Sequence, residues 1–361
     1  MHEHRLPAIL VLVAMFGIAM PLVAAGDKDI PRTASGRPDF SGHYDVGTLT
    51  PLVRPQAFGN KLFLSKDEAE RRVKQAALYR AATSQASDPD RDAPPDGGDG
   101  SPGAAGNVGG YNSFWIDNGT DVFAVDGKFR TSIITDPKNG RHPPVTDAAK
   151  ERRAARRGFW RANTGEAWWL ERDGVGPYDD PELRPLAERC LLGFSSTAGP
   201  PMLPALYNNL KRIVQTEDHV MILIEMVHDA RVVRIGGEHG PAEERRWLGD
   251  SIGRWEGDTL VIETANFGDR TGLSGATRDL RTVERFSAID GDSLLYQFTV
   301  EDPNTWTESW SGEYVWPRTD TLLYEYACHE GNYALGNIMR GARLLEQEAM
   351  AKAAHSSGSG E

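Results

Sequence analysis

Two short segments of this 361-residue sequence carry side chains that could transfer protons. The first contains Glu225, His228 and Asp229, followed by Arg231 and Arg234. Histidine is the side chain best suited to proton transfer near neutral pH, and adjacent carboxylate and guanidinium groups can tune it. The same residues also fit a purely structural strand end, in which the aspartate shapes a turn and an arginine pairs with a carboxylate. As functional candidates for catalysis, His228 is assigned to moving a proton and Asp229 to orienting it, and Arg231 or Arg234 is assigned to binding an anionic group.

The second segment, Tyr324–Tyr333 (YEYACHEGNY), crowds polar and aromatic side chains at the end of a predicted strand. His329 is a second candidate for moving a proton, and Glu330 is placed to orient it. Tyr326 and Tyr333 could each donate a hydrogen bond to a substrate. The alternative is that Glu330 and its neighbours only begin the closing helix.

Signatures of several enzyme classes are absent. The sequence contains no HExxH or CxxC motif, no P-loop and no convincing GxGxxG motif. Histidines and carboxylates of the two segments could bind a metal ion across strands, but no spacing fixes such a site. We therefore predict neither a metal ligand nor a cofactor. Tyr207, which follows a proline-rich loop, is added as a residue that could reach the mouth of a substrate pocket.

The elements that must position these residues are short strands joined by tight turns. From Asn209 onward, short runs alternate in polarity, and turn pairs such as Gly257-Asp258 and Gly291-Asp292 separate them. Such spacing, without a βαβ rhythm, predicts a mainly β fold: an antiparallel meander that closes as a lipocalin-like barrel or curls strongly over itself. The predicted strands are Asp39–Tyr44, Phe129–Thr135, Lys211–Thr216, His219–His228, Arg231–Ile235, Thr259–Phe267, Arg281–Phe286, Ser293–Val300, Trp306–Trp316 and Thr321–Cys328.

One face of this meander is rich in aromatic side chains. Successive residues of a strand point to opposite faces, so Leu294, Tyr296 and Phe298 share one face. Trp306 and Trp310 are expected to share a face on the next strand. These rings are either ordinary core packing or the lining of a barrel that holds a small planar or sugar-like ligand.

Helices are predicted at the periphery of the sheet. Ser65–Ala82 carries a capping box, with Ser65 at the cap and Glu68 three residues on. A second helix carries the basic run Lys150–Arg157, and Asn337–Ala354 forms a C-terminal helix.

The chain is therefore divided into four regions. Residues 1–25 form a signal peptide. Residues 26–110 form a lead-in with one helix and a disordered loop at 84–110, which has too few large apolar residues to order itself. The β-barrel-like domain spans 111–345, and residues 346–361 are the end of the helix and a disordered tail.

The N-terminus has the order of a secretory signal peptide. His2, His4 and Arg5 precede an apolar run that ends in the small residues of Val23–Gly26. The alternative is an uncleaved anchor, but the run is short for a membrane span, which needs about 20 apolar residues. We expect cleavage, no membrane insertion of the mature protein, and a periplasmic or secreted location.

The two cysteines, Cys190 and Cys328, are predicted to form a disulfide. Both lie past the signal peptide, and disulfides persist in oxidising compartments. The alternative is a pair of unpaired buried thiols. A bridge would fix the backbone that carries His329 and Glu330, and it would leave no thiolate for catalysis.

The net charge of −12 limits the possible partners. Nucleic-acid phosphates require a basic surface, so no nucleic-acid partner is expected. The basic run Lys150–Arg157 is more typical of a solvated helix face than of a binding patch. The expected partner is a small-molecule substrate or ligand, and the sequence does not give the oligomeric state.

Two stretches resemble a group of uncharacterised secreted bacterial proteins: Trp247–Phe267 (WLGDSIGRWEGDTLVIETANF) and Tyr324–Tyr333 (YEYACHEGNY). The resemblance extends over about Tyr111–Ala342 and carries no activity. The meander with its aromatic face is also similar to the lipocalin-like barrels. Some of those barrels are cofactor-free lyases, such as phenolic acid decarboxylases, which use Tyr, Arg and Glu. That similarity is one of fold, and a fold does not dictate a function.

These observations together predict a periplasmic, cofactor-independent lyase or isomerase that applies acid–base chemistry to a small aromatic or oxygenated molecule. Two alternatives stay open. The protein could be a periplasmic small-ligand binding protein without catalysis, which would need the aromatic side chains but not the histidines. It could instead be a metal-dependent hydrolase.

Overall fold

The computed structural model describes residues 30–84, 90, 116–161, 164–194 and 196–358. The predicted signal peptide lies outside the described residues, as does nearly all of the loop predicted at 84–110. None of the helices in the described ranges is both long enough and apolar enough to span a membrane.

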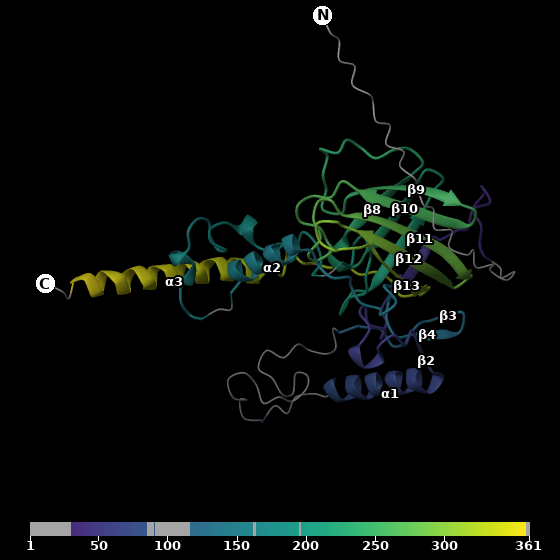
Figure 1. Ribbon diagram of the computed structural model, residues 1–361, viewed down its shortest axis with the longest axis horizontal. Helices are drawn as coiled ribbons and strands as arrows, with labels where there is room; N and C mark the ends of the chain where they lie inside the picture. The colour runs from purple at the N-terminus through teal and green to yellow at the C-terminus, as the bar shows by residue number, and fades with distance from the viewer. Residues whose placement is uncertain (1–29, 85–89, 91–115, 162–163, 195, 359–361) are drawn as a thin grey trace, which may run out of the picture.

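A ten-stranded sheet forms the main body of the structure (Figure 1). Neighbouring strands pair antiparallel, except β8 and β9, which run parallel. The sheet curls until Tyr44 of its first strand bridges Arg318, just past the end of β13. This confirms the mainly β fold, in the form of a strongly curled half-barrel. In the order of the sheet, its strands are β1 (Gly42–Asp45), β6 (Leu210–Gln215), β7 (His219–Ile224), β8 (Ala230–Ile235), β9 (Asp250–Glu256), β10 (Thr259–Ala265), β11 (Arg281–Asp290), β12 (Ser293–Glu301), β13 (Trp310–Pro317) and β5 (Ile134–Asp136).

Alternation of residue type decides which face of each strand turns inward. Along β12, Leu294, Tyr296 and Phe298 are buried, whereas the residues between them are partly exposed. The register places Tyr296 opposite Phe286 on one side and Tyr314 on the other. Because paired residues of neighbouring strands point to the same face, the inward side chains meet in one core.

A smaller sheet of three strands lies beside the large one, next to helix α1 (Figure 1). The helix begins with the predicted capping box: the Glu68 N–H donates to the Ser65 hydroxyl, and the Ser65 N–H donates to the Glu68 carboxylate. Ala69 of the helix packs with Leu64 of the sheet. These elements are β2 (Phe63–Leu64), β3 (Ala124–Val125), β4 (Lys128–Arg130), α1 (Lys66–Thr83) and the short η1 (Gln56–Phe58).

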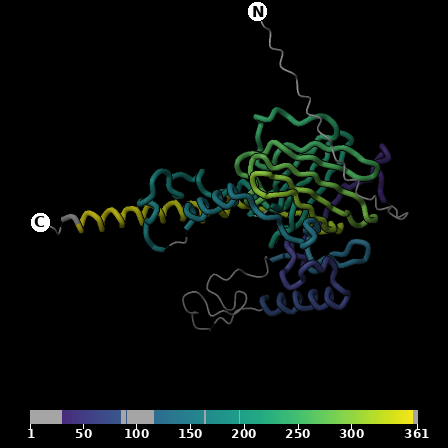
Figure 2. The backbone as a smooth tube through the Cα atoms, in the orientation of Figure 1, coloured from purple at the N-terminus to yellow at the C-terminus, as the bar shows by residue number. Residues whose placement is uncertain are grey.

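An arm extends away from the barrel (Figure 2). It consists of residues 164–194 and helix α3 (Tyr333–Gly358), which confirms the C-terminal helix and starts earlier than predicted. Trp169 and Ala342 pack together in the arm, and the Trp169 Nε1 donates to Glu346 at 2.7 Å. Helix α2 (Asp147–Phe159), with the basic run, lies near the base of the arm, and the arm also contains η3 (Trp168–Glu171) and η4 (Pro181–Leu183).

Two predicted strands have a different structure. The predicted strand Phe129–Thr135 is divided between β4 in the small sheet and β5 in the large one. The predicted strand Thr321–Cys328 is irregular chain. β13 already pairs with β12 on one side and β5 on the other, so it has no free edge for a further strand. The lead-in region contributes β1, which pairs with β6.

Candidate functional site

The inside of the curled sheet is filled by aromatic rings. Tyr296 is fully buried, and its ring centroid lies 4.9 Å from that of Phe286 and 5.0 Å from that of Trp316. Trp310 is also fully buried, and its ring meets Phe298 at 5.6 Å. The aromatic face predicted from the sequence therefore forms the core of the barrel, where its rings contact one another.

Residues 196–209, which we name the plug, pack into the barrel core at the end that we call the plugged end. The Met202 N–H donates to the Tyr296 hydroxyl, and the Met202 carbonyl accepts from the Tyr314 hydroxyl, both at 2.9 Å. Gly199 has a φ of +69°, and a Cβ on it would lie 2.4 Å from the backbone two residues on. Only glycine fits there, so the local sequence helps to fix how the plug enters the barrel.

Next to the plug, Arg231 belongs to a buried ion pair. Its guanidinium donates to both carboxylate oxygens of Glu284, at 3.0 and 2.7 Å, and also lies within 3.4 Å of Thr264 Oγ1. The Tyr296 hydroxyl donates to the same carboxylate at 2.6 Å. Burial disfavours the charge on Arg231, but the Glu284 carboxylate outweighs burial and raises the pKa of Arg231. Because Glu284 neutralises this arginine, its predicted role in binding a substrate anion has no support.

A second buried cationic side chain, Lys211, points into the same end of the barrel. Its Nζ donates to the carbonyl of Thr197 in the plug at 2.8 Å. Burial lowers the pKa of Lys211 to about 7, against the charges of Asp229 and Glu225. Burial likewise raises the pKa of Asp229 to about 6, against the charges of His228 and Lys211. Both groups therefore titrate close to neutral pH.

The carboxylate of Asp229 has spare hydrogen-bonding capacity. Its Oδ2 is buried and accepts no hydrogen bond from any residue that the structure describes. A buried polar atom without a partner is unfavourable. Titratable groups with perturbed pKa values cluster at functional sites. Asp229 therefore keeps a free acceptor position for a hydrogen bond or a proton.

A strained turn presents Asp229 to this end of the barrel. After β7 the chain forms the turn η5 (Met226–His228), in which Val227 and His228 have φ values of +59° and +42°. Residues other than glycine seldom adopt this left-handed conformation, and a β-branched residue does so least. Such strain clusters at functional sites. The predicted strand His219–His228 was thus too long, because His228 has left the sheet and is exposed.

The two proton-transfer segments predicted from the sequence meet at Glu225. This residue is buried, and its Oε1 accepts a hydrogen bond from the Tyr324 N–H at 3.2 Å. Burial raises the pKa of nearby Asp45 against a hydrogen bond from Gly47, and the charges of Asp117 and Glu225 add to the shift. The plugged end is therefore rich in carboxylates.

Among the described residues, no hydrogen bond joins the side chains of the catalytic residues predicted in the second segment to this cluster. Cys328 forms the predicted disulfide with Cys190, with Cα atoms 5.7 Å apart, and His329 and Glu330 follow it on an exposed turn. Within the part of the chain that the structure describes, no hydrogen bond or ion pair joins His329 to His228. The disulfide indicates an oxidising, extracellular compartment.

The remaining predicted binding residues are dispersed. Arg234 is paired with Asp250 through two hydrogen bonds of 2.7 and 3.0 Å. Tyr333 stands at the start of α3 with 78% of its surface exposed. Tyr207, in the plug, and Tyr326 are half-buried and pack against the barrel core.

Sequence reasoning missed Lys211 and Glu284. Both occupy inward positions of predicted strands, where alternation places apolar residues, and a charged residue at such a position is the signal that could have identified them. It also passed over Gly249–Gly253 (GDSIG), which has the GxSxG spacing of a hydrolase nucleophile elbow. That segment is part of β9 rather than a strand-to-helix turn, and Ser251 is buried against Arg231.

In the described ranges, no group of three or more His, Cys, Asp or Glu side chains is placed to hold a metal ion. The described residues therefore offer no donor set for the predicted metal-dependent hydrolase, which stays an untested alternative. Comparisons of the chain with known protein families, with curated proteins and with solved structures find no match. The resemblance to secreted bacterial proteins stays a prediction, and the function has to be argued from the site.

Proposed function

We propose that this protein is a cofactor-independent acid–base enzyme of the lyase or isomerase type, with Asp229 as the general base at the plugged end. The observation that carries the proposal is the buried Asp229 Oδ2, which lacks a hydrogen-bond donor among the described residues and lies in the field of Lys211. A general base is most effective when its pKa lies near the working pH. Burial, which raises the pKa of Asp229 to about 6, supports this role.

The neighbours of Asp229 have contacts that fit distinct roles. Lys211 provides a positive charge that can stabilise an oxyanion as it develops on a substrate. Its present hydrogen bond to the Thr197 carbonyl would be exchanged for one to the ligand. His228 lies exposed beside the proposed base and can pass protons between it and solvent. Glu225 acts as a positioning residue, because it holds the backbone of Tyr324.

The charge balance of the plugged end supports a small substrate with little negative charge. Arg231 is neutralised by Glu284, which leaves Lys211 as the cation that faces the carboxylates of Asp229 and Glu225. A substrate with several negative charges would be repelled. A neutral or singly anionic oxygenated molecule fits, and the half-buried tyrosines of the plug and second segment offer surface to an aromatic ring. We assign the enzyme to the periplasm, on the sequence of its N-terminus and on the disulfide.

Carriage of a small ligand inside the barrel is the weaker candidate. The rings that would line such a ligand are buried against one another, and the hydroxyls of Tyr296 and Tyr314 are bonded to the plug. A carrier would have to exchange these contacts for contacts to its ligand.

Exchange of carbon-bound hydrogen with solvent tests the proposal, because a general base that removes such a proton allows deuterium to replace it. The full chain is incubated in D₂O with a panel of phenolic acids and small 2-oxo acids, and deuterium uptake and product formation are followed by mass spectrometry. We expect turnover of at least one compound, and a loss of about 10²-fold or more in the Asp229→Asn variant.

Asp218→Asn is the matched control, because Asp218 is an exposed aspartate in the turn between β6 and β7. It should keep full activity. Equal turnover by Asp229→Asn and the wild type would exclude Asp229 as the base.

A further inference from the structure

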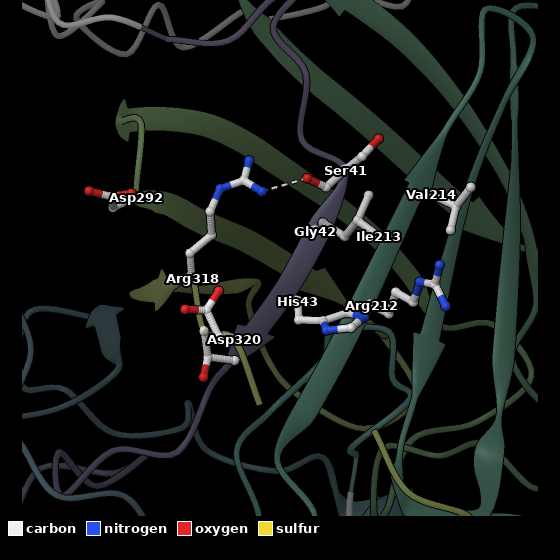
Figure 3. Close-up of a pocket in the computed structure, with 10 residues that line it drawn as sticks. Ser41, Gly42, His43, Arg212, Ile213, Val214, Asp292, Arg318 and Asp320 are labelled. Carbon is white, nitrogen blue, oxygen red and sulfur yellow. Dashed lines mark hydrogen bonds between the residues drawn. The ribbon is translucent and has the colours of Figure 1, made fainter. Parts of the chain in front are cut away.

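A groove of about 710 Å³ lies where the curled sheet closes on itself (Figure 3). Here β1 meets the chain that leaves β13: Tyr44 bridges Arg318, and the Thr319 N–H donates to the His43 carbonyl at 3.0 Å. We name it the seam groove. Arg212 of β6 lines it from the outer face of the sheet, whereas its neighbour Lys211 points into the barrel. The seam groove is therefore separated from the plugged end by the barrel wall.

The floor of the seam groove contains a fixed cation, Arg318. Its guanidinium donates to the carbonyls of Ser41 at 2.5 Å, Gly291 at 3.0 Å and Asp39 at 3.3 Å, and it lies 5.2 Å from the centre of the Tyr44 ring. All three acceptors are neutral carbonyls. Among the described residues no ion pair joins Arg318 to a carboxylate, so its charge is available to attract an anion at the groove.

The seam groove is lined by side chains of both charges. Arg212 and His43 lie along one side, and Asp320, Asp292 and Arg318 lie across from them (Figure 3). Arg212, Asp320 and Asp292 are exposed. In the described part of the chain none of these three side chains forms an ion pair, which leaves both signs of charge free to meet a ligand.

We propose that the seam groove binds a small zwitterion, such as an amino acid or a dipeptide. The carboxylate of the ligand meets Arg212 and His43, and its ammonium group meets Asp320 and Asp292 across the groove. The volume falls in the range of about 300–1,000 Å³ that is typical of small-molecule sites. Ion pairs exposed to solvent contribute little each. We therefore expect a dissociation constant on the order of 0.1–1 mM that rises with ionic strength.

Isothermal titration with three forms of one dipeptide tests the proposal on the full chain. The probes are Ala-Ala, N-acetyl-Ala-Ala and Ala-Ala amide. The free dipeptide should bind, and each cap should weaken binding by about tenfold or more, since each removes one of the two charges. Absence of binding by the free dipeptide, or equal binding of all three probes, would overturn the proposal. If the amide cap weakened binding and the acetyl cap did not, the groove would be a simple anion site, and the proposal of a zwitterion site would be overturned.

Two variants locate the binding. Arg212→Gln should weaken binding of Ala-Ala, and the amide cap should then weaken binding no further. Asp320→Asn should also weaken binding of Ala-Ala, and in this variant the acetyl cap should weaken binding no further. Arg281→Gln is the control, because Arg281 is an exposed arginine on β11 outside the groove. Both tested side chains are exposed, so thermal melting of the variants should match the wild type. Unchanged binding in Arg212→Gln with an intact fold would place the dipeptide elsewhere.

Discussion

At the scale of single residues, Asp229 and Lys211 control each other's protonation. The Lys211 cation favours the ionised form of Asp229, so its removal should raise the pKa of Asp229 above its present value of about 6. We expect Lys211→Met to move the carboxyl titration to higher pH, as measured by the ¹³C chemical shift of Asp229. An unchanged pKa of Asp229 in this variant would mean that the two groups do not interact.

Burial of Lys211 also makes stability depend on pH. Its pKa falls from about 10.4 in the unfolded chain to about 7 in the fold. The unfolded chain therefore holds the extra proton between these values, and stability is lost as the pH falls toward 7. Lys211→Met removes this penalty, and we expect a gain of about 1–4 kcal/mol near pH 6 that shrinks toward pH 10. Urea titrations at both pH values measure it, and an equal gain at both would contradict the assignment.

The Arg231–Glu284 pair should behave differently, because loss of one partner leaves a buried charge. We expect Glu284→Gln to lower the free energy of unfolding by about 3–5 kcal/mol. The exposed pair Arg278–Asp269 is the control, and Asp269→Asn should leave the free energy of unfolding nearly unchanged. Chemical denaturation of both variants gives the comparison. Similar losses in the two would mean that Arg231 is less isolated from water than its burial indicates.

At the scale of elements, the turn η5 allows the role of His228 in the proposed proton relay to be tested without disturbing the fold. Asparagine adopts the left-handed backbone of His228 more readily than alanine does. His228→Asn should therefore keep stability within about 0.5 kcal/mol and still lower turnover in the exchange assay. His329→Ala should keep both, because His329 is exposed and unconnected to the site. Loss of turnover in His329→Ala alone would move the site to the second segment.

The sequence predicted those elements whose signals are local. Alternation along β12 and the capping box at Ser65 depend on neighbours in the chain, and both are confirmed. The parallel pairing of β8 with β9 and the irregular course of Thr321–Cys328 depend on which sheet edges are free, which no local pattern encodes. The site role of Lys211 was missed for a related reason. Its hydrogen-bond partner, the Thr197 carbonyl, lies in the plug, which has no regular secondary structure.

At the scale of the whole molecule, the Cys190–Cys328 disulfide ties the arm to the chain that passes the plugged end. It closes a loop of 138 residues, and such a loop stabilises a fold by about 5 kcal/mol in the chain-entropy account. We expect reduction to lower the melting temperature in calorimetry, and to lower turnover before the barrel unfolds, because Tyr324 lies only four residues from Cys328. Two free thiols in denatured, unreduced protein would contradict the bridge.

The same disulfide closes a covalent ring that contains most of the barrel. Every strand from β6 to β13 lies between the two cysteines. A protease that cuts once in an exposed loop between the two cysteines therefore releases no fragment. The nicked protein stays a single covalent molecule, heavier by one water molecule, until a reductant separates the two pieces. In a compartment with proteases and no ATP-driven repair, a single backbone cut would leave both halves of the barrel held together and able to remain paired.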